Sequence, residues 1–81
     1  MNRDELDIRT PVTVHIQLLD EGTSRTRPIQ ALPIGKGLFM VLATRDYDPK
    51  IERWEFLPGS IVRLAVKTDP DGATYSLAVK V

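Results

Sequence analysis

The side chains that could carry out chemistry are few, and their spacing does not suit catalysis. His15 is the only histidine and the chain has no cysteine, so neither a histidine pair for zinc nor a thiolate metal site can form. His15 also falls on the polar side of an alternating segment, which is typical of a surface residue. Because the usual set of nucleophile, base and orienting group is missing, we expect no catalytic residue and no enzymatic activity.

Acidic residues occur in pairs that could offer oxygen ligands to a cation. Asp46 is followed at the second position by Asp48, and Asp69 by Asp71. Neither pair continues into the calcium-binding loop with its closing glutamate. Aspartate in turns is explained by hydrogen bonds to its own backbone. We therefore expect no metal site and no cofactor.

Two further groupings resemble active-site patterns. Glu52 and Glu55 could be paired carboxylates, but on a helical turn they would be solvated and interleaved with Lys50 and Arg53. A charged outer face is the simpler interpretation. The stretch "GKG" at 35–37 lacks the flanking spacing of a phosphate-binding loop, and it predicts a hairpin turn instead.

The residues best suited to contact another molecule are basic and aromatic. We select Arg27, Arg45, Tyr47, Arg53 and Trp54. Tyr47, Arg53 and Trp54 are of the types that anchor protein interfaces. The basic groove and stacking platform that binds single-stranded nucleic acid could instead be formed by four basic residues with Tyr47 or Trp54 nearby. The four are Arg25, Arg27, Lys36 and Arg45. A third interpretation places Trp54 in the core, as is usual for a lone tryptophan in a small domain.

The charge balance bears on this choice. The chain has 11 basic and 11 acidic residues and a formal net charge of zero, so no global field attracts nucleic acid or an anionic membrane. Acidic residues also lie close to the basic ones, as Asp46 does beside Arg45. No apolar run has the length of a signal peptide or a membrane span. Because the lack of cysteine suits a reducing compartment, we expect a cytoplasmic protein without membrane contact.

The elements that must position these residues are strands. "VTVHIQLLD", from Val12 to Asp20, alternates apolar and polar residues and predicts a half-buried strand. "RPIQALPI", from Arg27 to Ile34, is extended, but Pro28 and Pro33 exclude central-strand pairing at their positions. We predict an interrupted edge strand there. The unbroken apolar run from Leu38 to Ala43 predicts a central strand that is covered on both faces.

The last two strand segments flank the turn sequence "DPDG". Alternation predicts that Val62, Leu64 and Val66 face inward. A four-residue loop at 69–72 would set this row against a second apolar row in the buried face. The second row is Tyr75, Leu77 and Val79. A three-residue bulged loop would set the first row against other residues, so the apolar pattern favours the longer loop.

The connection from Tyr47 to Ser60, "YDPKIERWEFLPGS", holds the tryptophan. Its Asp-Pro start predicts a short helical turn near 49–54, because aspartate caps a helix and proline suits the first helical position. Pro58-Gly59 predicts a type II turn. The segment would act as a lid that lays Trp54 and Phe56 over an open end of the barrel.

Five extended segments linked mostly by tight turns predict an all-β fold. The expected architecture is a small antiparallel five-stranded barrel or strongly bent sheet, SH3-like or OB-like. At 81 residues the chain has room for one domain, which we expect to span residues 11–81. Residues 1–10 are too polar to anchor themselves and predict a mobile N-terminal arm.

Four stretches together resemble a pattern found in a group of small uncharacterised bacterial proteins. They are "LLDEGT", "RPI", "YDP" and "WEFLPGSIVR". The likeness runs from Leu18 to Arg63. No activity is established for this group, so the resemblance implies a bacterial domain and supplies no catalytic residues.

These observations favour a small non-enzymatic protein-interaction module that acts as an adaptor or modulator of a partner protein. The alternative is a small β-barrel that binds single-stranded nucleic acid. We expect a monomer or a homodimer, with the extended segment from Arg27 to Ile34 as an exposed edge for contact.

Overall fold

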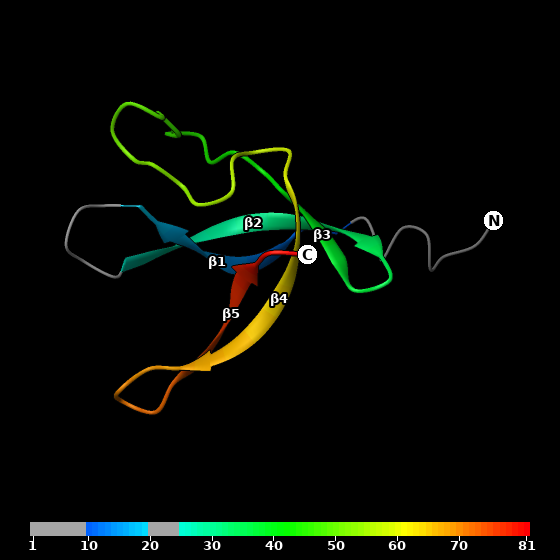
Figure 1. The fold of residues 1–81 in the computed structure, drawn as a ribbon, viewed down its shortest axis with the longest axis vertical. Helices are drawn as coiled ribbons and strands as arrows, with labels where there is room; N and C mark the ends of the chain where they lie inside the picture. The colour runs from blue at the N-terminus through cyan, green and yellow to red at the C-terminus, as the bar shows by residue number, and fades with distance from the viewer. Residues whose placement is uncertain (1–9, 20–24) are drawn as a thin grey trace.

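The structure is a computed structural model that describes residues 10–19 and 25–81. Its strands are β1 (Val12–Leu18), β2 (Arg25–Gly35), β3 (Leu38–Val41), β4 (Ile61–Thr68) and β5 (Thr74–Val79). They close into one barrel in chain order (Figure 1), and the described residues include no helix. The predicted all-β, five-stranded barrel is confirmed. Except for Thr10, the N-terminal arm predicted at 1–10 lies outside the described residues.

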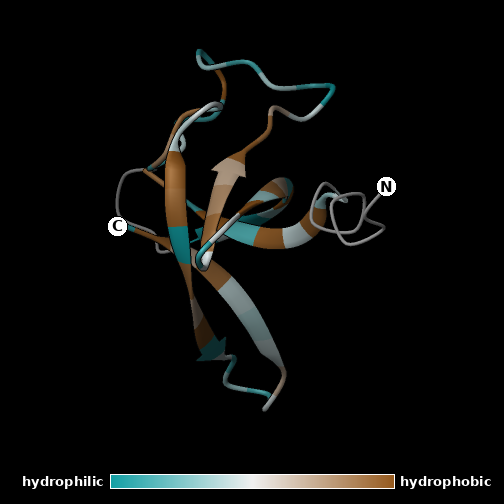
Figure 2. Cartoon of the chain, turned by 90° about the vertical axis from the view of Figure 1, so that its right-hand side faces the viewer, coloured by the Kyte–Doolittle hydropathy of each residue, from teal (hydrophilic) through white to brown (hydrophobic). Residues whose placement is uncertain are grey.

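The barrel interior is lined by apolar residues that alternate with outward-facing residues along each strand. On β1, Val14, Ile16 and Leu18 are buried, whereas His15 and Gln17 are half-buried on the outside, as predicted. Figure 2 shows the same alternation of apolar and polar bands along the strands. The other buried residues are Ile29, Ala31, Val41, Trp54, Val62 and Ala78. Burial of one large aliphatic side chain contributes about 1.5–3 kcal/mol, so a chain this small depends on every one of them.

Consecutive strands pair antiparallel, and the barrel closes between β1 and β5. These two strands run parallel, and their register matches His15 with Leu77. On the outside of this seam the His15 ring packs at a tilt against Tyr75, with ring centroids 4.8 Å apart and 51° between the ring planes. His15 Nδ1 lies 3.2 Å from Thr26 Oγ1. The histidine therefore supports the seam.

β2 is a strand with two halves, and the predicted interrupted edge is right in part, because Ala31 is the one residue in the registers of both neighbouring strands. Its first half pairs with β1 as far as Ala31, and its second half pairs with β3. Leu42 N–H donates to the Gln30 carbonyl at 3.0 Å, so every second residue of the first half, including Pro28, turns its backbone away from β1. Pro28 therefore removes no donor from the β1–β2 ladder.

β3 is central, as predicted, but only one of its faces is covered. It pairs with β2 on one side and with β4 on the other. Val41 is buried and Phe39 packs against the core, while Leu38 and Met40 are half-buried on the outside. The prediction that both faces are covered is therefore wrong, because the outer face of this barrel meets solvent.

The β4–β5 hairpin adopts the register that its apolar pattern disfavours. Val66 pairs with Ser76, and Asp69 N–H donates to the Ala73 carbonyl at 2.7 Å. The loop thus holds residues 70–72, and the predicted four-residue loop is wrong. A slip of one residue turns a strand over, so the second apolar row lies half-buried on the outer face. That row is Tyr75, Leu77 and Val79.

The hairpin leaves the barrel, which explains why the apolar pattern does not set its register. Figure 1 shows β4 and β5 running out past the other strands to their turn. Val62 is fully buried and Leu64 packs against the core, but Val66 is 76% exposed. The predicted inward direction therefore fails at Val66. Where no core lies beneath the strands, the geometry of the turn decides the pairing.

Residues 42–60 link β3 to β4 and are termed the crossover. The Asp48 carbonyl accepts hydrogen bonds from the N–H groups of Ile51 at 2.9 Å and Glu52 at 3.0 Å. The Asp48 carboxylate accepts the Lys50 N–H at 2.9 Å. These bonds form one capped turn that ends before Arg53, and no helix follows from it. The prediction for 49–54 is therefore right about the cap but wrong about the extent of the turn.

The crossover ends in the predicted turn at Pro58-Gly59. Ser60 N–H donates to the Leu57 carbonyl at 3.0 Å, and Gly59 has a φ of 93°. A type II turn needs a positive φ at its third residue, which strains any residue with a Cβ atom. This turn directs the chain into β4.

Candidate functional site

The crossover is joined to the end of β1 by backbone hydrogen bonds. Leu19 N–H donates to the Arg53 carbonyl at 2.7 Å, and Glu55 N–H donates to the Gln17 carbonyl at 2.9 Å. Trp54 lies between these two bonds and is 2% exposed. The predicted lid is present, and its tryptophan forms part of the core.

One carboxylate joins this lid to β2. Glu52 Oε1 accepts hydrogen bonds from Trp54 Nε1 at 3.1 Å and from Arg27 Nη1 at 2.7 Å. Arg27 Nη2 also donates to both carboxylate oxygens of Asp46, at 2.9 and 3.0 Å. Arg27 pairs across the ladder with the buried Ile16, so its side chain points to the inner face and reaches the barrel end. Arg27 therefore braces the crossover.

The members of this network shift one another's titration. The indole N–H of Trp54, and after it the guanidinium of Arg27, lower the pKa of Glu52. Glu52 and then Asp46 raise the pKa of Arg27. The Thr44 hydroxyl and then Arg27 lower the pKa of Asp46. Thr44 Oγ1 has no hydrogen-bond partner within 10–19 and 25–81, so the Arg27 contact is the firmer cause. The charged forms are favoured throughout.

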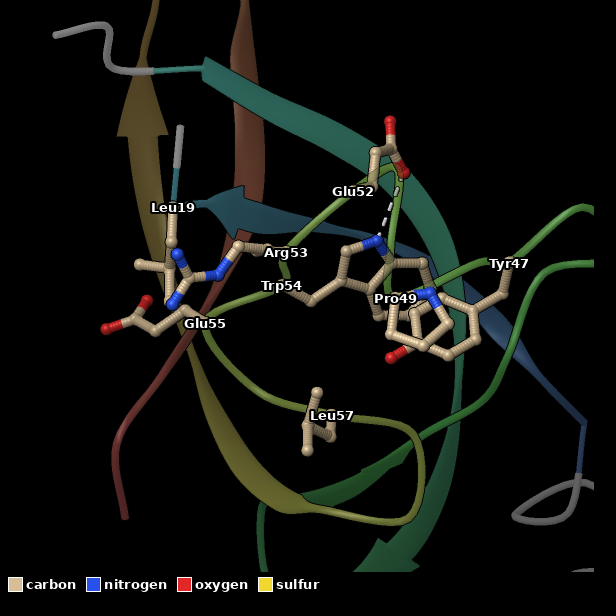
Figure 3. Close-up of a pocket in the computed structure, with 8 residues that line it drawn as sticks. All are labelled: Leu19, Tyr47, Pro49, Glu52, Arg53, Trp54, Glu55 and Leu57. Carbon is tan, nitrogen blue, oxygen red and sulfur yellow. Dashed lines mark hydrogen bonds between the residues drawn. The ribbon is translucent and has the colours of Figure 1, made fainter. Parts of the chain in front are cut away.

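A groove of about 350 Å³ opens beside the indole and is termed the crossover groove. Its lining consists of Leu19, Tyr47, Pro49, Glu52, Arg53, Trp54, Glu55 and Leu57. Figure 3 shows Leu19 and Arg53 on one side of the indole and Tyr47 and Pro49 on the other. Leu19 is 47% exposed and Leu57 is 57% exposed. The groove therefore combines a buried aromatic ring with accessible apolar side chains.

The wall on the Tyr47 side is held in place by the tryptophan. The two rings meet edge to face, with centroids 4.7 Å apart and an angle of 61° between their planes. Such aromatic pairs add about 0.5–1.5 kcal/mol beyond the area they bury. Since Glu52 fixes the other side of the indole, the groove is formed before any ligand arrives.

The structure brings together three of the five predicted contact residues. Tyr47, Arg53 and Trp54 line the crossover groove, but only Arg53 is exposed, while Tyr47 is half-buried. Arg27 lies apart from them, in a second hollow of about 330 Å³. Arg45 is exposed and lines neither hollow.

Sequence reasoning missed the apolar part of the groove. Leu19 could have been found, because two consecutive leucines in an alternating strand cannot both face inward. Pro49 and Leu57 carry no such signal. Glu52 was expected to be solvated on an outer face, which is wrong, because it is half-buried under Arg27. Glu55 is exposed, as expected.

Residues 10–19 and 25–81 contain no group of three or more histidine, aspartate or glutamate side chains placed to hold a metal ion. In the same residues no helix has the length and apolar character needed to cross a membrane.

No protein-family model, no curated protein and no solved structure gives a significant match to this chain.

Proposed function

We propose that this chain is a small non-enzymatic protein-interaction module that binds a segment of a partner protein in the crossover groove. The observation that carries the proposal is the exposure of Leu19 and Leu57 at the rim of a hollow with Trp54 at its base. Large apolar side chains that border a concave surface are typical of binding sites. A buried apolar anchor of the partner would cover both leucines.

The charged rim would orient the partner. Arg53 and Glu55 lie on the same side of the groove as Leu19 (Figure 3), and they offer one donor group and one acceptor group. Because Tyr47 and Trp54 already pack against each other, binding costs little ordering of the site. The module would act as an adaptor or modulator, since nothing in the groove activates a nucleophile.

The strand order supports an SH3-like architecture within this proposal. Each strand neighbours the next in sequence, and the last closes on the first, whereas an OB-like barrel has Greek-key connections. SH3 domains bind extended peptides in grooves lined by aromatic residues. A bacterial origin and a cytoplasmic location, both expected from the sequence, belong to the same proposal.

Binding of single-stranded nucleic acid is the alternative. Arg45 and Arg53 are exposed, but Arg27 is engaged by Asp46 and Glu52. Trp54 is too buried to stack against a base. Arg27 and Trp54 are therefore not available to form a basic groove and a stacking platform for single strands. Protein binding is the better supported function.

The proposal is tested by selecting peptides from a random display library on the immobilised chain. The selected peptides are then titrated by fluorescence anisotropy against the wild type and Leu57→Ser. Loss of an apolar contact of this size weakens binding about tenfold or more, so we expect at least that change.

Ile34→Ser is the matched control, because Ile34 is 44% exposed and lies on β2 outside the groove. It should leave peptide affinity unchanged. Peptides that bind Leu57→Ser and Leu19→Ser as tightly as the wild type would refute the groove. Salt-sensitive binding of a mixed-sequence oligonucleotide, with no peptide selected, would favour the alternative.

A further inference from the structure

The projecting half of β4 has an open backbone edge. β3 pairs with β4 at Ile61 and Val62, whereas β5 pairs with it from Arg63 to Thr68. In the part of the chain that the structure describes, no strand pairs with the other side of 63–68. Figure 1 shows the hairpin extending away from the remaining strands. An open edge of this length is a template for another strand.

The ladder fixes which residues present their backbone groups at this edge. Asp69 N–H donates to the Ala73 carbonyl across the hairpin, and in an antiparallel ladder every second residue faces the same neighbour. The backbone N–H and C=O groups of the odd-numbered residues of β4 therefore point toward β5. It follows that Leu64, Val66 and Thr68 turn their N–H and C=O groups toward the open side.

We propose that this edge pairs antiparallel with the same edge of a second copy of the chain, with Val66 on the two-fold axis. Leu64 then lies opposite the partner's Thr68, and Val66 lies opposite the partner's Val66. Each residue in these pairs presents donor and acceptor to the other. Val66, which is 76% exposed, becomes covered by its copy. This interface is separate from the crossover groove and does not depend on the function proposed for it.

Charge complementarity supports this register. Centred on Val66, the pairing sets Arg63 opposite the partner's Asp69, which is an attractive contact made twice by symmetry. Centred on Ala65, it would set Arg63 against the partner's Lys67, and centred on Lys67 it would set that lysine against its copy. Both of these registers place like charges directly opposite each other, which is destabilising.

The position of β3 excludes a further register. Pairing centred on Leu64 would set Val66 against the partner's Val62, whose edge β3 already occupies. The register centred on Val66 uses only residues beyond the β3 contact. With a formal net charge of zero, no overall repulsion opposes the association of two copies.

Cysteine cross-linking tests the register directly, because the chain has no cysteine of its own. Opposite residues in a hydrogen-bonded pair have Cα atoms about 5.5 Å apart, within the range of about 4.4–6.8 Å that a disulfide spans. Under mild oxidation Val66→Cys should form a covalent dimer of twice the 9.1 kDa chain mass. Ala65→Cys should stay largely monomeric. In this register position 65 lies opposite the partner's Lys67, so the two introduced cysteines are two residues out of line. Equal cross-linking of both variants, or none by Val66→Cys, would refute this register.

A charge exchange tests the same interface without a cysteine. Arg63→Glu and Asp69→Arg should each weaken dimerisation roughly tenfold in sedimentation equilibrium, because two attractive contacts become repulsive. Their equimolar mixture should recover wild-type affinity, since each contact then joins opposite charges. Lys50→Glu makes the same charge change at an exposed site on the crossover and should leave dimerisation unchanged.

Circular dichroism and tryptophan fluorescence of each variant establish that the fold is intact. A wild type that stays monomeric at millimolar concentration would overturn the proposal. So would a mixture no stronger than its components, or a mass series that rises beyond the dimer, because head-to-tail pairing does not close.

Discussion

The crossover and the β4–β5 hairpin are two connections that leave the barrel and end in opposite environments. The crossover folds back over one barrel end, and its Trp54 is 2% exposed. The hairpin runs outward, and its Val66 is 76% exposed. Both residues are apolar. The difference lies in what each connection can bond to.

The crossover carries groups that match the barrel end. Its Arg53 and Glu55 form backbone hydrogen bonds with Leu19 and Gln17 at the end of β1. Its Glu52 and Asp46 carboxylates form ion pairs with Arg27 on β2. Within the described residues, β4 beyond Val62 pairs only with β5, and its other backbone edge stays open. A connection is therefore retained on a small barrel when polar contacts position it, and apolar character alone does not ensure burial.

The largest effect expected from this contrast is on stability. Trp54→Ala should lower the free energy of unfolding by about 3–5 kcal/mol, because it empties the barrel end. Val66→Ala should change it by less than about 0.5 kcal/mol, since the side chain is mostly exposed. Urea denaturation followed by circular dichroism, at a protein concentration below that of dimerisation, measures both. Similar losses in the two variants would break the contrast.

A smaller effect is expected from the carboxylate that braces the lid. Glu52→Ala removes the acceptor of the buried Trp54 Nε1–H, and an unsatisfied buried donor costs about 1–3 kcal/mol. Glu55→Ala removes an equal charge from an exposed position three residues away and should cost less than about 0.5 kcal/mol. The same denaturation experiment compares them. If the two variants lose equal stability, the brace has no energetic importance.

The smallest effect concerns pH. The pKa of Glu52 in the folded state lies below its ordinary value of 4.5, first because of Trp54 and then because of Arg27. Its stabilising contribution is therefore complete above about pH 4.5 and is lost as the pH falls through the lowered value. The free energy of unfolding should decline over this range.

Trp54→Phe sharpens the test, because it removes the indole N–H that lowers the pKa of Glu52 most. The acid-induced loss of stability should then be shallower than in the wild type. Denaturation curves at several pH values between about 6 and 3 measure the two slopes. A slope in Trp54→Phe equal to that of the wild type would show that the indole does not tune Glu52.

The sequence predicts the strands best where a core lies beneath them. Alternation correctly places Val14, Ile16 and Val62 inside, because burying those side chains is the main gain on folding. It fails at Val66, where the same pattern continues into solvent. The prediction of a lid over the barrel end holds, since a lone tryptophan in a chain this small has few other places to be buried.

The candidate site is predicted less well. Residue type singles out Tyr47, Arg53 and Trp54, and all three line the crossover groove. Type alone does not reveal that Arg27 is engaged by two carboxylates, because Asp46 and Glu52 are distant from it in sequence. Leu57 was missed for the same reason, since only the fold brings it beside the indole.

The sequence by itself determined that this chain is all-β with five strands, in a barrel or a bent sheet, because period-two apolar patterns and turn residues are local properties. Tertiary structure alone decided the hairpin register, the burial of Trp54 and the pairing of Arg27. These depend on which distant groups meet at the barrel end and on where the core stops, and such contacts join residues that no local pattern relates.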